Sequence, residues 1–399
     1  MPTGRTRKNM NTQNILQAEQ TIVMETDDTM NKPLAPASPI RSGDAPGGDL
    51  PTVSVIITCY NYGRFLPAAI DSVLAEDVGA EIIVVDDCSS DNSRDVMRSY
   101  GDKIIPVFQP HNQGHGGAFN AGWAKATGDV IYFLDADDFV LPGGLKRGLQ
   151  MYEPGVLLYQ FRMRYSDETG TLAGVHPPME MPLGVGDISR QLREQGRFYT
   201  NVTSGLLFAR EGLEKVMPID AEDYRMSAEG YLVSVLPLYG PCRSFDETMS
   251  SYRLHGAQNW KAQADFGARA RKGLNHDFHR YEAIRKHAER QGLPVAANLG
   301  DADLLHLNDR LISLAFAPGE HPIPGDSIAR VVRLAKAVRP EAVSRSEIAA
   351  RWLWWTAMEL LPGGVRRQLL RWKMDPKTRP AWLANFGRFA RRRLGVFMR

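Results

Sequence analysis

Four short apolar runs dominate the chain between residues 50 and 140, and each one leads into polar residues. They cover Val53–Thr58, Glu81–Asp86, Ile104–Phe108 and Val130–Leu134. Helix-length stretches over 65–76, 91–100 and 115–126 separate them. Continuous apolar strands that alternate with helices are typical of a parallel sheet buried on both faces. The pattern therefore predicts an α/β fold, with the run that contains Pro106 at a sheet edge or a strand end.

The pattern changes after residue 150. Two β-like pieces at 156–161 and 204–208 lie among loops with Gly and Pro, and 226–236 is predicted to be a helix. After Trp260 the pattern is mainly helical, over 262–292, 300–316, 326–338 and 345–361. We therefore predict an α/β domain over 51–262 and a helical region over 263–399 that ends in a basic, aromatic tail. Residues 1–50 are polar and end in Pro, Ser and Gly, so we expect a disordered leader.

Composition changes this picture mainly at the C-terminal end. The 399 residues are 43% hydrophobic and 24% charged, and the net charge is only +2, so the overall charge gives no indication of a nucleic-acid partner. From Arg351 onward, ten Arg and two Lys face one Glu and one Asp, which gives this end a net charge of +10. The same end holds five of the seven Trp.

Cysteine usage and hydropathy bear on the compartment. Cys59, Cys88 and Cys242 form neither a metal-binding spacing nor an even set for disulfides, which favours a reducing compartment. No N-terminal apolar run resembles a signal peptide, and no window holds the roughly 18 apolar residues of a membrane span. We expect a cytoplasmic protein, with the inner face of the plasma membrane as the site of any peripheral contact.

Carboxylates gather where the apolar runs end. The first run leads into Thr58-Cys-Tyr-Asn61, the second into Asp86-Asp87-Cys-Ser-Ser-Asp91, and the fourth into Asp135-Ala-Asp-Asp138. Ligands of open α/β sheets bind at the carboxyl ends of the strands. If the first, second and fourth strands are neighbours, at least five carboxylates and several hydroxyls face one crevice.

Such a cluster needs a cation or protons, because like charges at short range repel. Mg²⁺ and Mn²⁺ prefer oxygen ligands and commonly use one or two carboxylates together with substrate phosphates. The spacing of Asp135 and Asp137 suits one acid on the ion and the other on a ribose or a water. The alternative is an Asp-rich turn that caps the next helix. Three acids in four positions, aligned with a second Asp pair, favour the cation site.

Four motifs in order carry a family resemblance. They are Val53-Ser-Val-Ile-Ile-Thr-Cys-Tyr-Asn61, Ile83-Val-Val-Asp-Asp-Cys-Ser-Ser-Asp91, Asn112-Gln-Gly-His-Gly-Gly-Ala-Phe-Asn-Ala-Gly122 and Tyr132-Phe-Leu-Asp-Ala-Asp-Asp138. Together they resemble family 2 glycosyltransferases over about residues 52–140. The resemblance implies a GT-A fold, that is, a Rossmann-like, mostly parallel central sheet flanked by helices. It also implies an inverting transfer of a sugar from a nucleotide-activated donor, with a UDP-sugar favoured, to an acceptor hydroxyl.

The same resemblance implies where the donor and the metal bind. The implied donor-binding residues are Thr58, Tyr60, Asn61, Asp86, Asp87, Asn120 and Asp135. Asp137 would hold Mg²⁺ or Mn²⁺, which stabilises the negative charge that develops on the leaving diphosphate. The glycines at 114–117 would let backbone approach closely, or would simply form a strand-to-helix loop.

An inverting transfer also needs a general base for the acceptor hydroxyl. In the family this is an Asp or Glu, often in a Glu-Asp pair in the second half of the domain. Glu222-Asp223 resembles that pair, whereas Glu229 opens an apolar helix, where the family often places the base. We favour Glu229 as the base and keep Glu222 and Asp223 as candidates; the alternative for Glu229 is an acid that only complements the helix dipole.

A Tyr252-Arg-Leu-His stretch follows the base region, as it does in many relatives. His255 would be a further metal ligand or a diphosphate contact, and Arg253 would pair with phosphate. A purely structural histidine is the alternative.

The C-terminal end suggests how an acceptor is reached. Trp382, Phe386 and Phe389 would share one helix face beside several Arg, and such a helix binds anionic membranes. The acceptor would then be a saccharide or a lipid-linked sugar of cell-surface polysaccharide or glycolipid synthesis. A helix that packs on the domain is the alternative, and no nucleic acid is expected, since no recognised binding fold accompanies the basic residues.

Two other functions use similar chemistry. A non-catalytic protein that binds nucleotide sugars would keep the carboxylate crevice but lack a working base. A sugar nucleotidyltransferase would also use clustered Asp and Mg²⁺ but would release pyrophosphate, and the sequence has no Lys- and Arg-rich triphosphate loop near the first strand.

Overall fold

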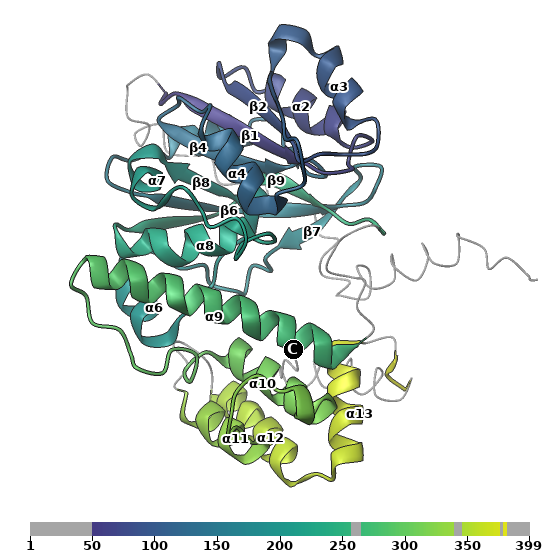
Figure 1. The fold of residues 1–399 in the computed structure, drawn as a ribbon, viewed down its shortest axis with the longest axis vertical. Coiled ribbons are helices and arrows are strands. Elements are labelled where there is room, and N and C mark those ends of the chain that lie inside the picture. Colours follow the sequence, from purple (N-terminus) through teal and green to yellow (C-terminus); the bar gives the residue numbers. More distant parts are fainter. Residues whose placement is uncertain (1–49, 257–264, 339–344, 376–377, 381–399) are drawn as a thin grey trace, which may run out of the picture.

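The computed structural model describes residues 50–256, 265–338, 345–375 and 378–380 (Figure 1). The predicted leader up to residue 49, the predicted boundary between 262 and 263, and the tail residues Trp382, Phe386 and Phe389 lie outside these ranges.

The sheet contains strands β1 (Val53–Cys59), β2 (Glu81–Asp86), β3 (Ile105–Phe108), β4 (Val130–Asp135), β5 (Phe139–Val140), β6 (Leu158–Ser166), β7 (Leu172–His176), β8 (Leu206–Ala209) and β9 (Cys242–Arg253). The helices of the same part are α2 (Leu66–Leu74), α3 (Ser93–Ser99), α4 (Gly114–Trp123), α5 (Gly144–Gln150), α6 (Ser189–Gln195), α7 (Arg210–Val216) and α8 (Ala228–Val235). The helices that follow are α9 (Phe266–Arg290), α10 (Leu304–Phe316), α11 (Ile328–Ala337), α12 (Arg345–Leu360) and α13 (Gly363–Met374).

The predicted α/β class is confirmed by the sheet, whose strand order is β3-β2-β1-β4-β8-β6-β9-β5, with β7 beside β6. The first four strands pair in parallel, as the apolar runs predict, and β3 with Pro106 lies at the edge. Beyond β4 the sheet is mixed, because β8 is antiparallel to both β4 and β6, whereas β9 is parallel to β6.

Both faces of the parallel half are buried. Val55 and Ile57 of β1 belong to a core cluster that includes α2, whereas Ile56 between them belongs to a second cluster that includes α4 and α8. Successive side chains of a strand point to opposite faces, so a strand covered on both sides must be apolar throughout. This is why the continuous apolar runs were good predictors of these strands.

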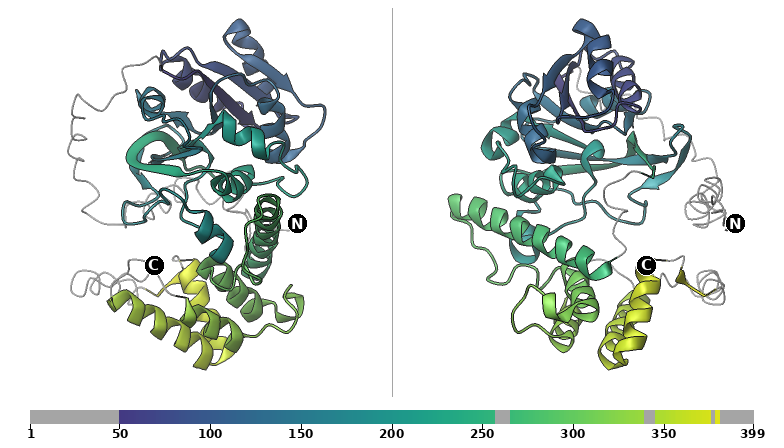
Figure 2. Two further views of the ribbon diagram at one scale, coloured as in Figure 1. Left: turned by 90° about the vertical axis from the view of Figure 1, so that its left-hand side faces the viewer. Right: turned by 45° about the vertical axis from the view of Figure 1, so that its right-hand side comes forward.

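The helix α9 connects two cores. Tyr281 and Ile284 on α9 belong to the same cluster as α4 and α8, whereas Ala270 belongs to a third cluster formed with α10–α13. In both Figure 1 and Figure 2, α9 accordingly lies between the sheet and the remaining C-terminal helices.

Strand β9 has no counterpart in the sequence analysis. Its middle, Phe245-Asp-Glu-Thr248, is polar and only partly buried, so it shows no apolar run. The strand is held by a long parallel pairing with β6, which has register shifts near Phe161 and Met163, and by a short pairing with β5. It brings Arg253, at its end, to the tip of β4.

Candidate active site

Three strand tips meet at one edge of the sheet. Cys59 of β1 is level with Asp86 of β2, and Thr58 is level with Asp135 of β4. The first, second and fourth apolar runs are therefore neighbours, and their acidic ends lie side by side at one edge of the sheet. Thr58 is almost buried, and its hydroxyl donates a long hydrogen bond of 3.4 Å to Asp135.

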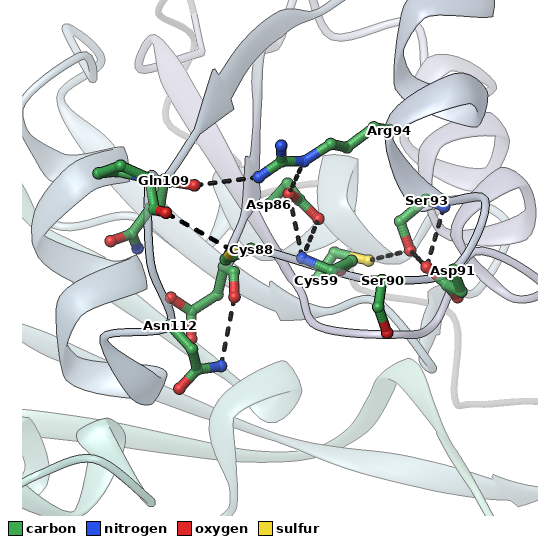
Figure 3. Close-up of polar contacts among 12 residues, drawn as sticks. Cys59, Asp86, Cys88, Ser90, Asp91, Ser93, Arg94, Gln109 and Asn112 are labelled. Carbon is green, nitrogen blue, oxygen red and sulfur yellow. Dashed lines mark hydrogen bonds and ion pairs between the residues drawn. The ribbon is translucent and has the colours of Figure 1, made fainter.

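The tip of β2 is organised by Asp86 (Figure 3). This carboxylate is fully buried, pairs with Nε of Arg94 at 2.6 Å and accepts from the Ser89 amide at 3.2 Å. Arg94 also donates to the carbonyl of Gln109 at 3.0 Å. Asp86 thus anchors α3 and the strand after it, and each of its oxygens keeps further acceptor capacity.

Asp87 joins the β2 tip to α4. Its two oxygens accept from the amides of Gln113 at 2.7 Å and Gly114 at 2.8 Å. Burial raises the pKa of Asp87, although these two hydrogen bonds oppose the effect. Asp87 therefore satisfies amides at the start of α4.

Tyr60 and Asn61 directly follow the end of β1. Asn61 has a left-handed backbone (φ 60°), which Asn tolerates better than most residues. Its side-chain oxygen accepts from the Ser90 amide at 2.8 Å, and its own amide donates to the Ser89 hydroxyl at 2.9 Å. The Tyr60 side chain projects outward and is 46% exposed. Asn61 fixes the loop, and Tyr60 offers an aromatic face at the rim.

The β4 tip places like charges side by side. Asp138 is buried and accepts from the Arg253 amide at 2.8 Å. Burial and the charges of Asp137 and Asp135 raise the pKa of Asp138 well above its usual range. Three negative charges at this tip are therefore unfavourable, and a bound cation would reduce the repulsion between them.

Asp137 and His255 form the contact best suited to a divalent cation. His255 is buried, and its Nε2 lies 2.8 Å from Oδ2 of Asp137. Adjacent ligands of an octahedral ion with bonds of about 2.1 Å lie about 3 Å apart, so this spacing fits one ion. Within the described residues, no three His, Cys, Asp or Glu side chains converge as a ready-made metal site. The donor set fits an ion that takes its other ligands from substrate phosphates and water.

Arg253 supports this pair from behind. Its Nε donates to the carbonyl of Asp137 at 2.6 Å, and its Nη1 donates to the carbonyl of Glu168 at 2.9 Å. The guanidinium also lies over the rings of Phe65 and Phe139. The side chain thus positions Asp137, and these contacts place it against backbone and aromatic rings.

The glycine run makes its close approach to another segment of this chain. A Cβ on Gly114 would lie 2.6 Å from the carbonyl of Arg225, and one on Gly116 would lie 2.9 Å from that of Tyr224. The amides of His115 and Gly116 donate to these two carbonyls at 2.8 and 3.0 Å. Gly114 also needs its left-handed backbone (φ 76°). The run therefore docks the segment before α8 onto α4.

Asn120 strengthens this docking. Its side-chain amide exchanges two hydrogen bonds of 2.8 Å with the backbone of Ile219. The predicted donor-binding residue thus lies one helical turn from the glycine run and holds the loop that leads to α8.

Docking brings Glu229, on the first turn of α8, close to the strand tips. Its side chain is only 16% exposed, and Oε2 lies 3.6 Å from Nδ1 of His115. Burial raises the pKa of Glu229, whereas the positive charge of His115 would lower it. A partly buried carboxylate with a raised pKa is a good acceptor for a proton near neutral pH.

The other two predicted bases lie elsewhere. Glu222 and Asp223 are exposed, and Asp223 contacts His279 of α9 through its carbonyl at 3.2 Å. The amides of both residues donate to Asp220. The structure therefore brings Glu229 to the strand tips and leaves Glu222 and Asp223 on the surface.

His115 is the site residue that the sequence analysis missed. Its Nε2 lies 3.2 Å from Oδ1 of Asp135, so it stands between Asp135 and Glu229. Burial lowers the pKa of His115, but the hydrogen bond to Asp135 and the nearby carboxylates outweigh it and raise the pKa. A bulky, titratable residue inside the glycine run Gly114-His-Gly-Gly117 was the available signal.

The helical end exposes apolar side chains. On α12, Trp352, Leu353 and Leu360 are 53%, 72% and 76% exposed, and Val365 follows on α13. Arg367 and Arg371 on α13 are exposed as well. None of the helices in the described ranges combines the length and the apolar composition that crossing a membrane requires.

Comparison with known proteins gives three similarities. A family profile described as glycosyl transferase family 2 matches residues 54–217. An uncharacterized glycosyltransferase of Nostoc sp. is 40% identical over 222 residues, which cover 53% of this chain and 67% of that protein. The Escherichia coli UDP-Glc:alpha-D-GlcNAc-diphosphoundecaprenol beta-1,3-glucosyltransferase WfaP is 28% identical over 180 residues, 44% of this chain and 68% of that protein.

Among solved structures, the mannosyltransferase PcManGT from Pyrobaculum calidifontis, in complex with GDP-Man and Mn²⁺, aligns with 90% of this chain and 94% of that chain. The alignment has 16% sequence identity and a TM-score of 0.46.

Proposed function

Because the chain belongs to glycosyl transferase family 2 and is a glycosyltransferase enzyme, we propose that it moves a sugar from a nucleotide-diphosphate sugar to an acceptor hydroxyl with inversion at the anomeric carbon. The GT-A class expected from the motifs is confirmed for the fold. The observation that carries the proposal is the position of Glu229. Only the side chain of His115 separates it from Asp135 at the strand tips.

Glu229 acts as the general base. Its carboxylate takes the proton of the acceptor hydroxyl, the acceptor oxygen bonds to the anomeric carbon, and the bond from that carbon to the phosphate oxygen breaks. The nucleoside diphosphate leaves on the opposite face, which inverts the configuration. The raised pKa of Glu229 suits this task, because a more basic carboxylate holds the proton better.

The strand tips bind the donor. Tyr60 presents an exposed ring to the nucleoside base. Asp86 and Asp87 are buried at the β2 tip, and the acceptor capacity left on their oxygens would serve N–H and hydroxyl groups of the nucleoside. Asp135 faces the ribose or a water. Thr58 and Asn61 shape the donor site but do not project into it, since Thr58 is almost buried and Asn61 contacts the β2 tip.

Asp137 and His255 would hold Mg²⁺ or Mn²⁺. Bound there, the ion would neutralise the charge that develops on the leaving diphosphate. Arg253 keeps Asp137 in place through its carbonyl, and Phe65 packs against the His255 ring at 5.0 Å between centroids.

The acceptor is a saccharide or a lipid-linked sugar of cell-surface polysaccharide or glycolipid synthesis. WfaP acts, by its name, on a sugar linked to a diphospholipid. The net charge of +10 from Arg351 onward and the exposed apolar side chains of α12 support peripheral contact with the anionic inner face of the plasma membrane. The donor is a nucleotide sugar, with a UDP-sugar favoured.

Calorimetric titration tests the donor site directly. UDP, GDP and TDP are each added to wild type and to Asp137→Ala, with and without Mn²⁺. We expect one diphosphate to bind only with the metal and the mutant to lose that binding. Glu214→Gln, on the exposed side of α7, is a control for charge removal. Equal binding by wild type and Asp137→Ala, or binding of none of the three with metal present, would contradict the proposal.

A further inference from the structure

His115 is closely packed beside the strand tips. It lies on the first turn of α4, its side chain is 20% exposed, and its ring packs edge-on against Phe119 at 4.4 Å between centroids. The glycines on either side fix its backbone against residues 224 and 225. The imidazole ring is therefore held in one orientation, and each of its two nitrogens points in a fixed direction.

The contacts of the two nitrogens define one tautomer. The Ala228 amide donates to Nδ1 at 3.2 Å, so Nδ1 must be unprotonated in this geometry. Nε2 then carries the proton and donates it to Asp135. The carboxylates on both sides raise the pKa of the imidazole, whereas the hydrogen bond from Ala228 is made only by the ring that is unprotonated at Nδ1.

The bare Nδ1 also faces the base. Oε2 of Glu229 lies 3.6 Å from it, and within the described residues this buried oxygen has no hydrogen-bond partner. Two acceptors face each other across this gap while Glu229 is ionised. Once Glu229 has taken up a proton, its O–H donates to Nδ1, and the gap becomes a hydrogen bond.

We infer that His115 is a positioning residue for glycosyl transfer, which fixes Glu229 relative to the donor-facing Asp135 and accepts a hydrogen bond from Glu229 after proton uptake. The inference rests on the proposed function. The acceptor proton moves from the hydroxyl to Glu229, and His115 gains none. His115 thereby links two carboxylates that come from segments far apart in the chain.

Two substitutions distinguish the roles of the two ring nitrogens of His115. In His115→Asn the side-chain oxygen takes the place of Nδ1 and still accepts from Ala228, but the donor to Asp135 is lost. In His115→Gln the longer amide reaches the Nε2 position and can still donate to Asp135. His111→Asn, at an exposed position, is the matched control. The readouts are the turnover of donor hydrolysis, the KM for the donor, the affinity for the nucleoside diphosphate and the melting temperature.

The probes are UDP-glucose, UDP-N-acetylglucosamine and GDP-mannose with Mn²⁺, and water is the acceptor. We expect His115→Asn to melt close to wild type and to keep its donor KM within about threefold, while turnover falls about 10–100-fold, the usual effect of losing an orienting partner. His115→Gln should recover several-fold over His115→Asn. His111→Asn should match wild type.

The outcomes separate the inference from the proposed function. If wild type hydrolyses a donor and His115→Asn is within twofold of it, the inference is wrong and the proposed function stands. If His115→Gln is no more active than His115→Asn at equal folded fraction, the contact with Asp135 has no role and the inference is also wrong. If wild type hydrolyses none of the three donors and binds no nucleoside diphosphate, both fail together.

Discussion

Two groups of buried acids in this molecule have opposite surroundings. At the strand tips, Asp138 and Glu229 face other carboxylates and His115. In the helical region, Asp277 and Asp303 pair with Arg197, which follows α6 in the α/β part of the chain, at 2.5 Å and 2.6 Å. The first group is short of positive charge, and the second is supplied with it.

The pKa values follow these surroundings. At the strand tips, burial and neighbouring carboxylates raise the pKa of Asp138. In the helical region, burial acts in the same direction on Asp277, but His306, Arg197 and Arg280 outweigh it and lower the pKa. Buried acids whose negative charge is balanced by Arg or His side chains stabilise the fold. Buried acids that lack such partners favour the binding of a cation or a proton.

The largest effect is expected from removing the base. Glu229→Gln keeps the size of the side chain but cannot accept the proton, so transfer should fall about 10²–10⁴-fold. Nucleoside diphosphate binding should persist, since Asp137 and His255 are untouched. Rates of product formation under saturating donor give the measurement. Glu222→Gln, at the exposed alternative, should transfer normally; a larger loss there than in Glu229→Gln would move the base to Glu222.

Breaking another compensated pair of the helical region should act on stability instead. Arg310 is 3% exposed and pairs with Asp326, which is fully buried, at 2.7 Å. Arg310→Met leaves that carboxylate without its guanidinium and should lower the free energy of unfolding by about 3–5 kcal/mol, measured by urea denaturation. Arg190→Met removes an exposed pair with Glu194 on α6 and should leave stability unchanged. Equal stability of the two variants would show that the buried pair contributes no more than a surface one.

The third effect is spread over several pH units and concerns an acid of the helical region that behaves like those of the site. Burial and the charge of Asp277 raise the pKa of Asp309 to about 7, against the opposing charges of Arg197 and Arg269. The folded chain thus keeps a proton that the unfolded chain releases near pH 4. The free energy of unfolding should therefore fall as pH rises from about 4 to about 7, by at most about 1.4 kcal/mol per pH unit, and stay level above.

Asp309→Asn should remove this dependence, because the amide does not ionise. Melting temperatures of wild type and Asp309→Asn at pH 5, 6, 7 and 8 give the measurement. The melting temperature of Asp309→Asn should exceed that of wild type by an amount that grows with pH up to about pH 7 and is constant above it. A difference that is constant from pH 5 to 8 would mean that Asp309 titrates normally and that the helical region is compensated at this position too.

Much of the fold and part of the site could be predicted from sequence. The parallel strands β1, β2 and β4 were found because burial on both faces makes them continuously apolar. The acids at their tips were found because a strand and the residues that follow it are contiguous. Strand β9 was missed, because its polar middle gives no apolar pattern and its pairing with β6 spans distant residues.

The chain by itself determined the parallel strands β1–β4, the acidic strand tips and the family, since each depends on residues that are close in sequence. Tertiary structure decided which acid joins the site. Glu229 rather than Glu222 reaches the strand tips because Gly114 and Gly116 admit the backbone of residues 224 and 225, and because Asn120 holds Ile219. Contacts between segments about a hundred residues apart depend on how surfaces fit together, and a local sequence pattern does not predict that fit.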